Sequence, residues 1–225
     1  MPGKRTRLVP DPPSPLPLPR VLTLQADVAL LHRTFDGTFA ANAFNPGKGQ
    51  RTRFAPIITV AGKVIPTLYA GATLETAFFE STLHDVSIDG TDRVVAYSSL
   101  LNRQYAALSA TRDLSLAQLF SPDLKQWHIE RSQLIDTSAY HYRYTARWAE
   151  ALHAAMPAID GLVWTSRQDD QHHAYMLFGD RVESDHLAVI NGPREIVNDL
   201  ELFAKLRACA EAIGARIGEP DPSGI

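Results

Sequence analysis

The sequence predicts a mixed α+β domain in which small β-sheets are flanked by helices. Short runs rich in β-branched and aromatic residues recur along the chain, as in residues 56–71, 92–100 and 160–167. Helical stretches separate these runs irregularly, and a longer amphipathic segment covers residues 194–215 near the C-terminus. Since the regular strand–helix alternation of a doubly wound sheet is absent from this pattern, the α+β class fits best.

Composition sets broad limits on function. The 225 residues suit one large domain, or a domain with a tail, and the net charge of −3 offers no overall basic field for nucleic acid. Cys209 is the only cysteine, so an internal disulfide or a Cys-rich zinc site is excluded. No apolar run is long enough to span a membrane, and the N-terminus lacks the apolar core of a signal peptide. We therefore expect a cytoplasmic protein with no membrane partner.

Residues 1–20 form a proline-rich tail that we expect to be extended or disordered, because proline blocks helices and removes backbone donors. This tail could wrap on the domain, which is the preferred interpretation, or it could be an arm that touches a partner. The folded domain is then expected over residues 21–225.

The first half of the domain contains a loop, a hairpin and a helix. Residues 27–35 mix helix and strand signals, and residues 44–57 read as a loop punctuated by glycine and proline that runs into a strand. A hairpin is expected around Gly62, within residues 56–71. Thr73 can then cap a helix from Leu74 to about Leu83.

The second half alternates less regularly between strands and helices. Strands are expected over residues 92–100, 160–167, 174–180 and 186–192, and a short helix is expected over residues 115–120. Residues 144–156 are predicted to form a helix capped by Thr145. The closing helix over residues 194–215 carries apolar side chains at helical spacing, and its start could be broken.

Glu80 is the most informative residue of the predicted helix. It lies among Ala77, Phe78, Phe79 and Leu83, just after a strand that ends at Tyr69. A carboxylate buried in apolar surroundings is costly unless it is paired or hydrogen-bonded. Taken alone, Glu80 could pair with a structural arginine, or it could be solvated if the helix has a different phase.

One arginine and three sequence motifs, in this order along the chain, resemble the RES domain, a toxin of bacterial toxin–antitoxin pairs. They are Arg33, "FNPGKGQRTRF" at 44–54, "PTLYAGATLETAFFESTLHD" at 66–85, and "GLVWTSR" at 161–167. The family is named for an arginine, a glutamate and a serine, and the serine matches Ser166. The resemblance covers roughly residues 25–190 and is weakest in the last motif, where Trp164 stands in place of a common tyrosine.

The resemblance implies a fold like that of ADP-ribosyltransferase toxins and an activity that consumes NAD. Glu80 would then stabilise the positive charge that grows on the ribose as nicotinamide leaves. Tyr69 would stack on nicotinamide, Ser166 would bond a ribose hydroxyl or the nicotinamide amide, and Arg33 and Arg53 would hold the pyrophosphate. NAD is the substrate in this scheme, and no metal is required.

Other residues are weaker candidates. Glu75 could replace Glu80, although it sits in the first helical turn, where a carboxylate favours the helix dipole. His84 could lie at the rim of the pocket or at the surface.

His172 and His173 are adjacent, but neighbours on a strand point to opposite faces, which disfavours a shared metal ion. Residues 141–148 mix aromatic and arginine side chains, and we interpret them as core plus a solvated face. The glycines of 44–57 do not match a Walker phosphate loop.

Two classes of function remain open from the sequence. The first is an NAD-consuming toxin held inactive by an Xre-like helix-turn-helix antitoxin, with water, phosphate or a host protein side chain as the acceptor of ADP-ribose. The second is a non-catalytic nucleotide-binding or DNA-associated module. The first is favoured because Arg33, Arg53, Tyr69, Glu80 and Ser166 are all present.

Overall fold

A large curled sheet organises the protein, as seen in a computed structural model that describes residues 8–84, 86 and 93–220. Eight strands of the described chain form this sheet, in the order β1 (Val21–Leu24), β8 (Leu114–Gln118), β9 (Gly161–Thr165), β10 (His173–Phe178), β5 (Thr67–Gly71), β2 (Leu30–Asp36), β7 (Arg103–Ala110) and β11 (Leu187–Glu195). All pairs are antiparallel except β8 with β9.

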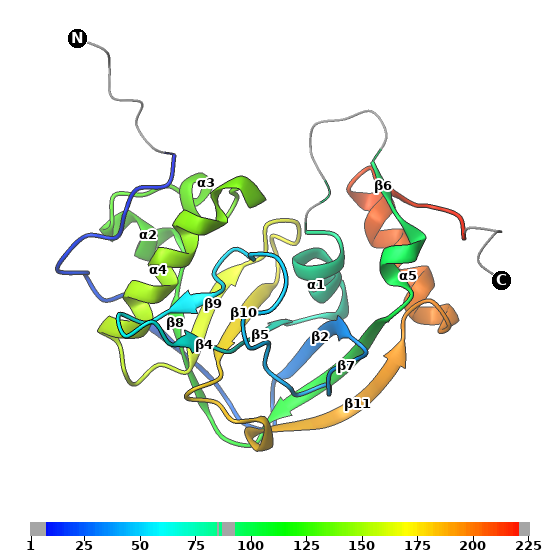
Figure 1. Cartoon of the computed structure of the whole chain (residues 1–225), viewed down its shortest axis with the longest axis horizontal. Coiled ribbons are helices and arrows are strands. Elements are labelled where there is room, and N and C mark those ends of the chain that lie inside the picture. The colour runs from blue at the N-terminus through cyan, green and yellow to red at the C-terminus, as the bar shows by residue number, and fades with distance from the viewer. Residues whose placement is uncertain (1–7, 85, 87–92, 221–225) are drawn as a thin grey trace, which may run out of the picture.

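Helices lie in two groups over the two halves of this sheet (Figure 1). One group comprises α2 (Ser121–Gln126), α3 (Arg131–Leu134), the 3₁₀ turn η3 (Ala139–His141) and α4 (Tyr142–Ala155). The other comprises α1 (Leu74–Ala77), the π-helical turn η1 (Phe78–Thr82) and α5 (Leu200–Ala212). Short elements complete the described fold: β3 (Ile57–Ile58) with β4 (Val64–Ile65), β6 (Val94–Val95) with β12 (Arg216–Ile217), and the 3₁₀ turns η2 (Tyr97–Leu100) and η4 (Ser184–His186).

Side chains of the sheet alternate between separate apolar cores. On β10, Ala174 and Met176 pack with the α2–α4 group, whereas Tyr175 and Leu177 join a core built mainly from the sheet itself. On β7, Tyr105 points instead toward the α1–α5 group. This period of two is that of a pleated strand buried on both faces. The strands between the two helical groups carry the cleft described below.

Residues 8–20 lie against the α2–α4 group. Val9 is fully buried, the Trp148 indole donates to the Pro10 carbonyl at 2.9 Å, and the Trp127 indole donates to the Pro17 carbonyl at 2.7 Å. Arg20 makes two side-chain hydrogen bonds to Asp123, at 2.8 and 2.9 Å. The described part of the proline-rich tail is therefore extended and bound to the domain. The division of the chain at residue 20 stays a prediction.

The α+β class is confirmed, although most strands join one large sheet. The hairpin around Gly62 forms as β3 and β4, and the buried strand after Asp160 forms as β9. Thr73 caps α1, where its hydroxyl accepts a hydrogen bond from the Thr76 amide at 3.1 Å. Every helix in the described part of the chain is too short or too polar to cross a bilayer.

Several predicted elements are wrong in kind or extent. The short helix expected over 115–120 is strand β8, because pairing with β1 and β9 on its two sides satisfies its backbone and buries Leu116 and Ala117. The strand expected over 92–100 is reduced to β6, followed by a 3₁₀ turn. The closing helix begins only at Leu200, after an Asp199 cap, because Arg194 and Glu195 belong to β11.

Thr145 does not cap the helix expected over 144–156. That helix begins at Tyr142, and Thr145 is buried inside it, where its hydroxyl donates to the Arg53 carbonyl. Burial within residues 141–148 otherwise follows the expected division. Tyr142 and Trp148 are buried, whereas Arg143 and Arg147 are exposed.

Candidate active site

A cleft of about 610 Å³ brings together four of the five predicted site residues. Arg33 comes from β2, Tyr69 from β5 and Glu80 from η1, and Arg53 lies in the segment between β2 and β3. The volume lies in the range of small-molecule sites in proteins, roughly 300–1,000 Å³. Ser166 does not line the cleft, and it lies behind Glu80.

Glu80 owes its position to a local change of helix type. The helix starts as an α-helix at Leu74 but continues as a π-helical turn, in which the Leu83 amide donates to the Phe78 carbonyl at 2.8 Å. Such π-turns occur frequently at functional sites. Phe78 and Phe79 are buried in the core shared with α5, whereas Glu80 is half-buried and reaches the cleft. The expected helix is therefore present, with a wider turn where the carboxylate sits.

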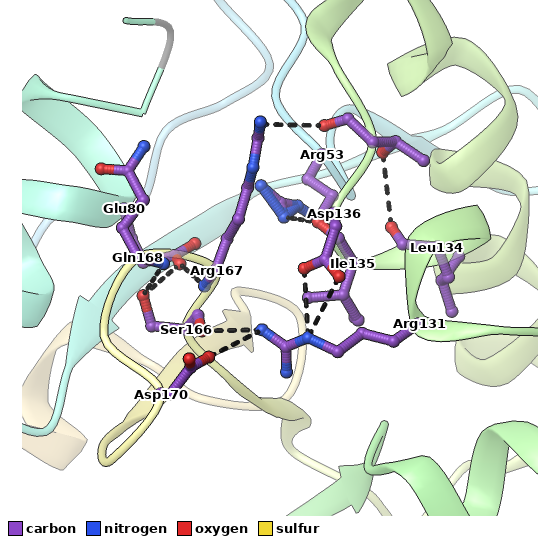
Figure 2. A network of polar contacts seen from close by, with 11 residues as sticks. Arg53, Glu80, Arg131, Leu134, Ile135, Asp136, Ser166, Arg167, Gln168 and Asp170 are labelled. Atoms are coloured by element: carbon purple, nitrogen blue, oxygen red, sulfur yellow. Dashed lines mark hydrogen bonds and ion pairs between the residues drawn. The ribbon is translucent and has the colours of Figure 1, made fainter. Parts of the chain in front are cut away.

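Two donors from the β9–β10 loop hold the Glu80 carboxylate (Figure 2). The Ser166 hydroxyl donates to Glu80 Oε1 at 2.7 Å, and the Arg167 backbone amide donates to the same oxygen at 3.1 Å. Among the described residues, no partner is seen for Oε2. The carboxylate is thus oriented through one of its two oxygens.

Ser166 is itself held in place and has no exposed surface. Arg131 donates to the Ser166 carbonyl at 2.8 Å and also pairs with Asp136 at 3.1 Å (Figure 2). The Ser166 hydroxyl therefore faces Glu80 from inside the protein. In this geometry, the serine is placed to position the glutamate, and the direct substrate contact that the family resemblance implies for Ser166 stays a prediction.

Tyr69 is a fixed wall of the cleft. Its hydroxyl accepts hydrogen bonds from the Thr52 hydroxyl at 2.9 Å and from the Phe54 amide at 3.0 Å. Its ring packs edge-on against Trp164, with the ring centroids 6.1 Å apart. Burial raises the pKa of Tyr69 well above its ordinary value, so the phenol stays protonated at neutral pH. The side chain offers a ring surface to the cleft, and the predicted stacking on nicotinamide stays a prediction.

The two predicted phosphate ligands are largely built into the protein. Arg33 is 8% exposed and donates to the Ala41 carbonyl at 2.6 Å, and burial lowers its pKa to about 10. Arg53 is 4% exposed, donates to the Ile135 carbonyl, and lies 5.8 Å from the centre of the Tyr142 ring. Within the described chain, the buried Nε of Arg53 has no hydrogen-bond partner. Each guanidinium borders the cleft, but part of its donor set is already used.

The cleft is strongly basic although the chain is acidic. Among the described residues, five Lys or Arg side chains and two carboxylates line it, whereas the whole sequence carries a net charge of −3. The cations are Arg33, Lys48, Arg51, Arg53 and Arg103, and the carboxylates are Asp36 and Glu80. A cleft lined by one sign of charge concentrates ligands of the opposite sign. The site is therefore suited to an anionic ligand, with a single glutamate at its inner wall.

Sequence reasoning missed three of these cations. Arg51 stands two residues before Arg53 in the quoted "RTRF", and Lys48 lies in the same glycine-containing loop, so their place in the motif was a usable signal. Arg103, on β7, pairs in register with Asp36 and has no signal in the sequence. His84 also lines the cleft, and its ring stacks on Tyr142 with the ring centroids 6.1 Å apart.

The other candidates lie elsewhere. Glu75 points to a separate hollow between α1 and α5, where Lys205 binds it at 3.1 Å. His172 pairs with Asp169 at 2.9 Å, whereas His173 lies on β10 against Phe120. Within the described residues, no group of three or more His, Cys, Asp or Glu side chains is placed to hold a metal ion.

Comparison with known proteins identifies the family. A model of the RES domain matches residues 27–197, which is more than half of the chain and includes all five predicted site residues. The chain therefore belongs to the RES domain family, and the resemblance described above is confirmed. Among curated protein sequences, none matches significantly.

A solved structure shows the same fold. It is a chain of the M. tuberculosis MbcT–MbcA toxin–antitoxin complex, with a TM-score of 0.53 and 14% sequence identity, covering 80% of this chain and 89% of that chain. At this identity, the likeness bears on the fold alone. It agrees with the mixed α+β architecture predicted from the sequence.

Proposed function

We propose that this protein is the toxin of a toxin–antitoxin pair and that it cleaves the bond between nicotinamide and ribose in NAD. Three observations support the proposal: membership of the RES family, a fold shared with a chain of a toxin–antitoxin complex, and a basic cleft with one oriented carboxylate. The observation that carries most weight is the Glu80 carboxylate, held by Ser166 and Arg167 at the wall of that cleft.

Cleavage of the nicotinamide–ribose bond requires mainly that the protein place a negative charge close to the ribose. When the bond breaks, its electron pair stays on the pyridinium nitrogen, so nicotinamide leaves as a neutral molecule and needs no general acid. Positive charge then grows on the ribose, and a fixed carboxylate nearby stabilises it most where water is excluded. Glu80 is that carboxylate in this proposal, and its Oε2, which has no partner among the described residues, faces the ribose or one of its hydroxyls.

The remaining site residues bind the substrate and exclude water from the reacting bond in this proposal. Tyr69 presents its ring to the nicotinamide and keeps water away, while Arg33 and Arg53 give the cleft its positive potential beside the pyrophosphate. An acceptor then attacks the ribose and loses its proton. We infer that ADP-ribose passes to a protein or small acceptor, with water and phosphate as the alternatives.

A partner follows from the proposed activity. An enzyme that consumes NAD harms its own cell unless it is blocked, and we infer that an Xre-like helix-turn-helix antitoxin blocks it in the cytoplasm. The activity would reside in residues 21–225, with residues 1–20 as a tail. Nucleic acid and membrane are not expected to bind the toxin directly, and no metal takes part in the proposed reaction.

Product identification tests the proposal. Purified protein is incubated with NAD, with and without phosphate and cell extract, and the products are resolved by mass spectrometry. Free ADP-ribose, ADP-ribose phosphate or mass added to a protein would each support NAD cleavage and identify the acceptor. Glu80→Gln should greatly reduce the amount of product, whereas Glu75→Gln, which makes the same charge change outside the cleft, should not. NAD that binds but stays intact in buffer alone, with phosphate and with cell extract would instead support a non-catalytic nucleotide-binding module.

A further inference from the structure

The cations of the cleft fall into two groups that differ in how far their donors are already used. Arg33 and Arg53 are more than nine-tenths buried, and each donates to a backbone carbonyl. Lys48 and Arg51 are exposed, and neither side chain has a hydrogen bond or an ion pair with any described residue. A phosphate is bound best by a guanidinium whose two parallel donors are both free. By this criterion, Arg51 is better suited to bind phosphate than either buried arginine.

Arg103 is less available than Arg51. It is half-buried on β7 beside Asp36, and these two residues are partners in the strand register. The pKa of Asp36 is lowered, chiefly by hydrogen bonds from Thr38 and to a smaller extent by Arg103. The charge of Arg103 is therefore partly balanced within the protein, which leaves Arg51 and Lys48 as the uncommitted cations on this rim.

Loop 45–51 holds these two residues in a defined shape. Asn45 accepts hydrogen bonds from the amides of Gly47 and Lys48 at 2.9 and 2.8 Å, and it donates back to the Lys48 carbonyl at 3.0 Å. Gly47 has a φ of +92°, and a Cβ there would lie 2.7 Å from Val64. Asn45 is also paired with Thr67 on β5 through both backbone groups. The start of the loop is thus fixed to the same strand that carries Tyr69.

The end of the loop is fixed to Tyr69 itself. Thr52, the residue after Arg51, donates its hydroxyl to the Tyr69 hydroxyl at 2.9 Å, and its amide donates to the Ala55 carbonyl at 3.0 Å. Arg51 therefore stands at the mouth of the cleft, next to the residue that anchors the proposed nicotinamide wall. The pre-ordered loop lowers the entropy lost when the side chain binds a ligand.

We propose that Arg51, assisted by Lys48, binds the diphosphate of a dinucleotide at the cleft mouth, while Arg33 and Arg53 serve mainly to build the wall and its positive potential. This inference rests on the proposed use of NAD and adds the residues that select a diphosphate. It assigns ground-state binding to loop 45–51 and bond cleavage to Glu80.

The test separates phosphate binding from chemistry. Calorimetry measures ADP-ribose, which carries the diphosphate, and nicotinamide riboside, which carries no phosphate, on wild type, Arg51→Gln, Lys48→Gln and Arg207→Gln. Arg207 is an exposed arginine of α5 outside the cleft, so it controls for the same loss of charge. Arg51→Gln should weaken ADP-ribose binding by roughly tenfold or more, as expected for the loss of charge-assisted hydrogen bonds. Lys48→Gln should act in the same direction but less strongly, because an ammonium is a single point charge.

Two controls separate a loss of phosphate binding from a general loss of binding or stability. Nicotinamide riboside should bind Arg51→Gln as it binds wild type. The melting temperature should not change, because the exposed Arg51 side chain has no hydrogen bond or ion pair with any described residue. In turnover, KM for NAD should rise while kcat stays near that of wild type, as for a residue that binds ground state and transition state equally.

The failures of the two proposals are distinguishable. Wild type that binds ADP-ribose through Arg51 but leaves NAD intact would end the proposed function and retain this inference. NAD cleavage by Arg51→Gln with an unchanged KM for NAD would retain the function and overturn the inference. Equal weakening of ADP-ribose and nicotinamide riboside, or wild type that does not bind ADP-ribose at all, would also overturn it.

Discussion

The Ser166 hydroxyl donates a 2.7 Å hydrogen bond to Glu80 Oε1 across 86 positions of sequence. It joins the loop after β9 to the π-helical turn after α1, and the Arg167 amide binds the same carboxylate oxygen. Two of the three residue types that give the RES family its name are thus in direct contact. Through this contact, a serine without exposed surface supports Glu80, the one glutamate that lines the cleft among the described residues.

Glu80→Gln should reduce NAD cleavage by about a hundredfold, roughly 3 kcal/mol of transition-state stabilisation, because the amide keeps the size of the side chain but loses its charge. Single-turnover kinetics would measure the chemical step directly. Glu75→Gln is the matched control, since Glu75 pairs with Lys205 outside the cleft. A folded Glu80→Gln protein that turns over NAD at the wild-type rate would rule out the assigned role.

Ser166→Ala should lower kcat by roughly tenfold with little change in KM, because the Glu80 charge remains but loses one of its two fixed donors. A double-mutant cycle distinguishes this positioning role from a merely structural one. In the Glu80→Gln background, Ser166→Ala should have almost no further effect on rate, since the two residues act as a unit. Additive losses would show that the serine acts through something other than Glu80.

Arg53→Lys should destabilise the fold as well as weaken ligand binding. The lysine keeps the charge but cannot reproduce the guanidinium contact with the Ile135 carbonyl and the Tyr142 ring. Loss of a buried hydrogen bond to a charged group typically costs about 1.5–3 kcal/mol. Denaturant unfolding would measure the change in stability, with Arg207→Lys as the exposed control. Unchanged stability would show that the wall contacts of Arg53 contribute little.

Short-range patterns in the sequence were sufficient to predict part of this site. The Thr73 cap and the helix that carries Glu80 depend on short-range signals, and both are present. The strand expected to end at Tyr69 is also present, but it continues to Gly71. The π-helical turn could not be predicted in the same way. It depends on how Phe78 and Phe79 pack with Leu202 and Leu206 of α5, more than 120 positions away in the sequence.

Long-range pairing also explains the errors in secondary structure. Residues 115–120 have a composition that suits a helix, but β8 is paired on both sides and buried on both faces, so tertiary contacts override local propensity. The roles of the arginines follow the same logic. Nothing in "RTRF" indicates that Arg53 donates to the carbonyl of Ile135, just after α3, while Arg51 is exposed. That difference depends on a residue 82 positions further along the chain.

The N-terminal segment should detach from the domain in acid. Asp123 has no exposed side-chain surface, and burial alone would raise its pKa, but hydrogen bonds from the Arg20 side chain and backbone outweigh this effect and lower it. A carboxyl whose pKa is lower in the folded state stabilises that state above its unfolded pKa of about 3.9. Its contribution is lost as pH falls through the lower, folded value. Asp123→Asn should therefore be less stable than wild type at pH 7, and the difference should disappear in strong acid.

Thermal unfolding of wild type and Asp123→Asn across this pH range would measure the difference, and limited proteolysis would show whether residues 8–20 are released first. Arg147→Gln is a useful comparison, because Arg147 pairs with Asp11 of the same segment at 2.7 Å but both side chains are about half exposed. An exposed pair of this kind contributes little to stability, so Arg147→Gln should behave almost as wild type at every pH. A stability difference between wild type and Asp123→Asn that persists unchanged in strong acid would show that the effect comes from packing of the asparagine and not from the charge on Asp123.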